Sequence, residues 1–225
     1  MHLNKMRILF FIITVCIFEI GLSQYKQPEE VKFDAFLTEI QYSSDNPDAI
    51  EMVFWLPTKF WEISVAQDAS LTYDDFVAIK ELLENYELFA VVDGEIGYFG
   101  GVTYKTAEET LKGLSIFYQG EKLKIVDPKE LSSDLIAFTS MMKPMMANMM
   151  GPMGENMHFI FMSRSSGNID PYAEDNFLLE LDDFKREVDL PLESLLEEKE
   201  CPKDGKLHSG KWTYCPFHGV KLISK

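Results

Sequence analysis

Apolar and polar residues follow two periods along residues 33–200, one typical of strands and one typical of helices. Short apolar runs at 87–92 and 98–104 flank a glycine-containing loop, which predicts a β-hairpin. Runs at 114–119 and 122–126 predict a second hairpin in the same way. Two successive hairpins imply an antiparallel sheet. Further strands are expected at residues 50–56, 157–162, 177–181 and 184–188.

Helical spacing of apolar residues, together with start signals, predicts helices between these strands. Thr72 is placed as the N-cap of one helix. Thr106 and Glu109 have the spacing of a capping box, which opens a short helix. Ser132 or Ser133 precedes a longer helix. The predicted fold class is therefore α+β, a mainly antiparallel sheet with two or three helices, followed by a small β module.

Composition divides the chain into segments. Residues 24–32 are polar and are expected to form a flexible lead-in. Residues 33–200 carry the alternating pattern and are expected to form one α+β domain, whose family the sequence does not identify. Beyond Glu200, Lys, Gly and His become frequent and a Cys-Pro phrase occurs twice, so residues 201–225 are expected to form a separate tail.

The N-terminus has the layout of a secretory signal peptide. Lys5 and Arg7 precede an apolar run at 8–18, and small residues follow it. Cleavage is expected after Ser23, which makes residues 1–23 the signal peptide. The mature protein is therefore expected to be exported, to the periplasm or to the extracellular space.

The chain is strongly acidic, with 21 Lys and Arg against 37 Asp and Glu and a formal net charge of −16. Such a surface repels nucleic acid and anionic lipid, so no nucleic-acid partner is expected. After the signal peptide is removed, no remaining segment is long and apolar enough to predict a transmembrane helix. The expected partner is a protein or another component of the cell envelope.

The tail contains a short phrase twice, Cys-Pro-Lys-Asp-Gly and Cys-Pro-Phe-His-Gly. The phrases resemble the two knuckles of a zinc ribbon. Zinc ribbons are a family of small β modules that usually contain the motif Cys-Pro-x-Cys-Gly twice. In a knuckle, a tight turn follows the cysteine and brings a second ligand, three residues later in the sequence, to the same ion. Glycine tolerates the left-handed backbone conformation that comes next. The resemblance implies a structural zinc ion with four ligands: Cys201, Asp204, Cys215 and His218.

The tail leaves alternatives open. Aspartate is a harder ligand for zinc than cysteine or histidine, so His208 is an alternative to Asp204. An exported chain meets an oxidising environment, so Cys201 and Cys215 can instead form a disulfide. That bond would close a 15-residue loop and contribute roughly 3 kcal/mol, against on the order of 10 kcal/mol for a structural zinc. A hairpin with neither cross-link is the third possibility.

Eight methionines fall between residues 141 and 157, mostly on the predicted long helix, which ends near residue 150. Helical geometry places six of them in two adjacent columns: Met141, Met145 and Met149, and Met142, Met146 and Met150. Thioethers are soft ligands that select Cu(I), so copper is a second candidate cofactor. Methionine is also an adaptable packing residue, and Leu135 and Phe138 begin an apolar face on the same helix. We therefore favour packing over metal binding for this helix.

The sequence carries no recognisable catalytic signature. It contains no G-x-S-x-G, P-loop or dinucleotide-binding fingerprint. His158 opens an apolar strand, where a structural histidine is the commoner case. We therefore expect an exported, non-enzymatic binding or interaction protein with a structural zinc ion in its tail. Two other hypotheses are periplasmic copper handling through the Met-rich helix and a hydrolase of unknown class that uses His158 with a nearby carboxylate.

Overall fold

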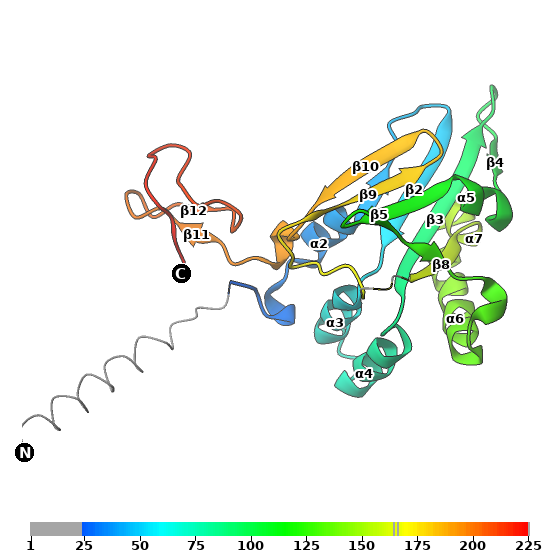
Figure 1. Ribbon diagram of the computed structural model, residues 1–225, viewed down its shortest axis with the longest axis horizontal. Coiled ribbons are helices and arrows are strands. Elements are labelled where there is room, and N and C mark those ends of the chain that lie inside the picture. Colours follow the sequence, from blue (N-terminus) through cyan, green and yellow to red (C-terminus); the bar gives the residue numbers. More distant parts are fainter. Residues whose placement is uncertain (1–23, 164, 166, 225) are drawn as a thin grey trace, which may run out of the picture. The chain divides into compact units, whose positions relative to one another are not determined.

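The computed structural model describes residues 24–163, 165 and 167–224 (Figure 1). The expected signal peptide, residues 1–23, lies outside the described residues. Within the described ranges, no helix is both long enough and apolar enough to cross a membrane.

The chain divides into two compact units. The larger unit is Gln27–Leu195, and the smaller unit combines residues 196–224 with residues 24–26. Within the smaller unit, Tyr25 forms an isolated antiparallel bridge with Leu196.

The first sheet of the larger unit pairs all its strands antiparallel, in the order β1-β2-β3-β8-β7, with β4 also paired to β3. The predicted hairpin of β3 and β4 is confirmed, with Gly94 opposite Tyr104. Its turn lies at residues 97–101, so the strand expected to begin at residue 98 is wrong in its first residues and begins at Val102. Pairing of β3 with β8 brings together segments that are distant in the sequence. The strands are β1 (Gln41–Ser43), β2 (Ala49–Trp55), β3 (Glu87–Ile96), β4 (Val102–Tyr104), β7 (Lys124–Ile125) and β8 (His158–Ser163).

The second sheet has the order β10-β9-β5-β6 and is also antiparallel. Its strands are β5 (Leu114–Tyr118), β6 (Glu121–Lys122), β9 (Asn176–Leu181) and β10 (Phe184–Asp189). The single strand expected at 122–126 is wrong, because Lys122 pairs with Phe117 in this sheet whereas Lys124 pairs with Ser163 in the first sheet. Leu123, which lies between them, is buried. The chain therefore crosses from one sheet to the other at Leu123.

The two sheets pack against each other through aromatic side chains. Trp55 on β2 meets Phe177 on β9 edge to face, with ring centroids 5.0 Å apart. Tyr42 on β1 approaches the same ring at 6.2 Å. Strand β9 alternates buried and less buried positions, and Phe177, Leu179 and Leu181 all point into the core. In Figure 1, β9 and β5 accordingly lie over β2.

Six α-helices are present in the described part of the chain, where two or three were expected, and the α+β class is confirmed. Helices α3 and α6 meet through Trp61 and Phe138, whose ring centroids are 5.2 Å apart. The helices are α2 (Phe33–Ile40), α3 (Thr58–Gln67), α4 (Tyr73–Leu82), α5 (Ala107–Gly113), α6 (Ser133–Met150) and α7 (Pro152–Glu155). Short 3₁₀ turns lie at Pro28–Glu30, Pro128–Glu130 and Glu193–Leu195.

The predicted helix starts are confirmed. Thr72, Thr106 and Ser132 each accept a hydrogen bond at 3.3 Å from the backbone N–H three residues later. Helix α2 was not predicted, because its N-cap position, Lys32, makes no side-chain cap. Its stability comes from burial of one face, which includes Phe36.

Lys105 links the two sheets at their rim. Its Nζ lies 3.0 Å from Oδ1 of Asp93 on β3 and also donates to Asp182 in the turn between β9 and β10. Asp93 is only 1% exposed. Burial raises the pKa of the Asp93 carboxyl, and the hydrogen bond and positive charge of Lys105 oppose that rise. Lys105 therefore compensates a charge that would otherwise be buried alone.

We predict that Lys105→Ala lowers the free energy of unfolding by about 2–4 kcal/mol at neutral pH, because it leaves Asp93 buried without its cation. A raised carboxyl pKa in the folded state means that stability is lost as pH rises through that pKa. The deficit of the variant should therefore be smaller at about pH 4 than at about pH 7. Urea unfolding at the two pH values measures it. Lys112→Ala is the control, because the Lys112–Glu108 pair is exposed and should change stability by about 0.5 kcal/mol or less. An equal, pH-independent loss in both variants would contradict this role of Lys105.

Candidate metal centre

The smaller unit contains a three-stranded antiparallel sheet in the order β12-β11-β13. Strand β11 is Lys199–Glu200, β12 is Leu207–His208 and β13 is Ile223–Ser224. The first Cys-Pro phrase forms the turn between β11 and β12, and the second precedes β13. The sheet therefore holds the two phrases in one small module.

The two phrases fold into the same turn. In the first, the Gly205 N–H donates to the Cys201 carbonyl at 2.8 Å, and in the second, the Gly219 N–H donates to the Cys215 carbonyl at 2.9 Å. Both glycines have a positive φ, +70° and +63°. A side chain would be strained there, so glycine at the fifth position of each phrase is required by the backbone.

The chain also leaves both turns in the same way. The Cys201 N–H donates to the Lys206 carbonyl at 2.9 Å, and the Cys215 N–H donates to the Val220 carbonyl at 2.8 Å. The residue before each cysteine pairs with the residue six positions after that cysteine: Glu200 with Leu207, and Tyr214 with Lys221. The repeat in the sequence is thus a repeat in backbone geometry.

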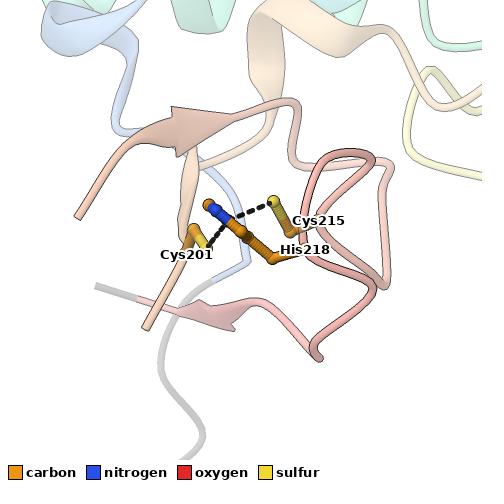
Figure 2. Close-up of side chains that lie close together, drawn as sticks. All are labelled: Cys201, Cys215 and His218. Atoms are coloured by element: carbon orange, nitrogen blue, oxygen red, sulfur yellow. Dashed lines mark hydrogen bonds between the residues drawn. The ribbon is translucent and has the colours of Figure 1, made fainter. Parts of the chain in front are cut away.

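Three of the four predicted ligands come together between these turns. Nδ1 of His218 lies 3.4 Å from Sγ of Cys201 and 3.5 Å from Sγ of Cys215, and Figure 2 shows the imidazole between the two sulfurs. The three ligand atoms all lie within 4.8 Å of one another. Tetrahedral zinc, with bonds of about 2.0–2.3 Å, places its ligand atoms about 3.5 Å apart. Cys201, Cys215 and His218 are therefore close enough to bind one metal ion.

The fourth predicted ligand, Asp204, lies beside this cluster. It occupies the position in the first turn that His218 occupies in the second. Its Oδ2 is 3.9 Å from Nδ1 of His218, and its carboxylate also neighbours the thiol of Cys201. Its Oδ1 accepts a hydrogen bond from the Lys206 N–H at 3.2 Å, which fixes the side chain over the turn.

His208 also lies near the cluster. Its Nε2 lies 3.6 Å from Sγ of Cys215. The ring stacks on Trp212, with centroids 5.8 Å apart, and has Phe217 at 6.1 Å. Asp204 thus neighbours two members of the cluster and His208 neighbours one, so geometry favours Asp204 although imidazole is the better zinc ligand.

Cys201 and Cys215 are both free and buried. Burial acts to raise the pKa of each thiol, and for Cys201 this effect prevails, so its pKa is raised. For Cys215, hydrogen bonds from the backbone N–H groups of Phe217 and His218 and from Cys201 outweigh burial and lower the pKa. The equivalent amides of the first turn also donate to Cys201. Both turns therefore direct N–H groups at sulfur, as a thiolate ligand requires.

The other candidate residues lie in the larger unit. His158 is half-buried, and its Nε2 lies 3.0 Å from the Lys105 carbonyl oxygen. Since a carbonyl only accepts, Nε2 donates this bond. The methionines of α6 divide in two: one column is buried or half-buried, and the other, Met141, Met145 and Met149, is exposed. The sequence could not predict which column is buried, because that depends on tertiary packing.

We predict that Cys201→Ser, Cys215→Ser and His218→Ala each weaken the binding of added zinc by more than about 100-fold. Loss of a residue that only contacts a ligand weakens metal binding by up to about 100-fold, and loss of a ligand itself should weaken it more. Asp204→Asn should weaken binding by at least about tenfold, and His208→Gln by less. Competition with a colorimetric chelator measures all five, with Lys203→Ala in the first turn as the control. A larger loss in His208→Gln than in Asp204→Asn would make His208 the fourth ligand and Asp204 a bystander.

The comparisons with known proteins do not assign a family. No family model, no curated protein and no solved structure matches the chain. The metal site therefore rests on the paired turns and on the three converging side chains.

Proposed function

We propose that the protein is an exported, non-enzymatic binding protein whose C-terminal module is organised by one zinc ion. The observation that carries the zinc proposal is the approach of Cys201, Cys215 and His218 to within 4.8 Å of one another. Two sulfurs and an imidazole are a donor set typical of zinc, and the closed arrangement within a β module is typical of a structural site rather than a catalytic one. The zinc would hold the two turns together, as the resemblance to a zinc ribbon implies.

A binding role is supported by the hairpin of β3 and β4. Tyr98 and Phe99 lie at its tip and are each 97% exposed. The turn closes behind them, where the Gly97 N–H donates to the Gly101 carbonyl at 2.7 Å. Their rings contact each other edge to face at 5.2 Å. Adjacent, fully exposed aromatic side chains on a narrow hairpin are costly to leave in water and are typical of a contact surface.

A non-enzymatic role is supported by the contacts of the titratable groups near His158. The hydrolase hypothesis needs His158 as a base with a nearby carboxylate. Nε2 of His158 is bonded to a backbone carbonyl, and the nearby Asp93 is paired with Lys105. These contacts give His158 and Asp93 structural roles in joining the strands. Export is supported by the N-terminal sequence pattern.

We predict about one zinc ion per chain in protein purified from its export compartment, with two thiols titratable after denaturation and chelation, because both cysteines are free. Elemental analysis and thiol titration of the same sample measure this. Protein without zinc and without titratable thiols would instead support a disulfide between Cys201 and Cys215. Protein without zinc but with two thiols would leave the tail as a hairpin with neither cross-link.

We predict that the double variant Tyr98→Ser/Phe99→Ser loses a specific contact without losing stability. Both rings are exposed, so the free energy of unfolding should change by no more than about 0.5 kcal/mol. A photo-reactive side chain at Gly101, where an added Cβ meets nothing within 4 Å, should give a discrete adduct in the native host, and that adduct should disappear in the double variant. Tyr73→Ser is the control, because Tyr73 is 71% exposed on helix α4. If the adduct still forms in the double variant, Tyr98 and Phe99 are not part of the binding surface.

A further inference from the structure

Helix α6 carries two columns of methionine in different surroundings. Met142 is 4% exposed, and Met146 and Met150 are half-buried against the core. In contrast, Met141, Met145 and Met149 are 68%, 49% and 71% exposed. Packing therefore accounts for the first column and leaves the second unexplained.

The exposed column consists only of methionine. Ile136, the other exposed large apolar residue of α6, is 49% exposed and lies about 140° around the helix from Met141. A surface that docks a protein normally combines aromatic and aliphatic side chains with polar ones at its rim. Exposed helix positions are ordinarily filled by charged residues, as Lys143 is in the same turn. What the three exposed positions share is a thioether sulfur.

The helix is well placed to hold these side chains in order. Helix α7 folds back onto the end of α6, and Gly154 lies so close to the Met146 carbonyl that a Cβ there would overlap it. The column is therefore presented by a helix that is packed on its inner face and near its C-terminal end.

We propose that Met141, Met145 and Met149 form a Cu(I)-binding site on the surface of α6. Side chains four residues apart on a helix are neighbours, with Cβ atoms about 5–6 Å apart. Two such thioethers can reach one ion between them, and the central Met145 can pair with either neighbour. Thioether sulfur is a soft ligand that selects Cu(I) over Zn²⁺ and other harder divalent ions. The site uses neither the residues nor the compact unit of the proposed zinc centre, so either one can fail without the other.

The test is Cu(I) binding by the full mature chain with Cys201→Ser/Cys215→Ser, which removes the thiols that would also bind Cu(I). Under anaerobic conditions, copper is supplied as the Cu(I)–bicinchoninate complex, and ascorbate keeps it reduced. The loss of the complex's colour measures transfer of Cu(I) to the protein. We expect about one Cu(I) per chain, with only sulfur ligands in its X-ray absorption spectrum. The Leu triple variant of Met141, Met145 and Met149 should lose this binding, because it keeps the apolar surface and removes the sulfur.

The matched control is the Leu triple variant of Met146, Met150 and Met153, the half-buried methionines, which should retain Cu(I) binding. Circular dichroism confirms that each variant is folded. Absence of Cu(I) binding in the thiol-free chain, or equal binding by both triple variants, would overturn the proposal and leave the exposed column as an apolar contact surface. Loss of Cu(I) binding in the control variant alone would also overturn the proposal, and would place the copper at the half-buried methionines Met146, Met150 and Met153.

Discussion

The stability of the smaller unit is limited by its composition, because it has too few apolar side chains to fold by hydrophobic burial alone. Its buried cluster consists of Cys201, Cys215 and Leu222, with Val220 packed against them. A module of about 30 residues normally needs a metal ion or a disulfide to be stable. Two members of this cluster are thiols, so the proposed metal, or a disulfide in its place, would use atoms that also form the core of the module. The two repeated turns bring the sulfur atoms of Cys201 and Cys215 close together.

The larger unit does not share this dependence. Its two sheets bury a continuous core between them, in which the Trp55–Phe177 contact is central. Its buried charges are compensated within the unit, as Asp93 is by Lys105 and as Glu87 is by hydrogen bonds from Trp55 and the backbone of Ile169. We therefore infer that a tail without the proposed metal would unfold and leave the larger unit intact. The aromatic tip and the exposed methionine column both belong to this stable part.

Local signals in the sequence predicted local structure. The caps at Thr72 and Thr106 and the spacing of the Cys-Pro phrases depend on a few adjacent residues, and the helix starts and the approach of three ligands followed from them. Helix α2 lacks a capping side chain at Lys32, so its start carried no such signal. Features that depend on distant segments could not be predicted, including the pairing of β3 with β8 and the division of 122–126 between two sheets. The sequence named His208 as an alternative to Asp204, but its distance from the cluster could not be predicted, because it depends on the pairing of β11 with β12.

The most direct test of the account is the zinc X-ray absorption spectrum of the chain from residue 24 to residue 225. The paired turns predict two sulfur ligands at about 2.3 Å and two nitrogen or oxygen ligands at about 2.0–2.2 Å. A spectrum with nitrogen and oxygen ligands only would show that zinc binds elsewhere on the acidic surface. Four sulfur ligands would show that the ion joins the cysteines of two chains. Either result would contradict a site built within one chain from Cys201, Cys215 and His218.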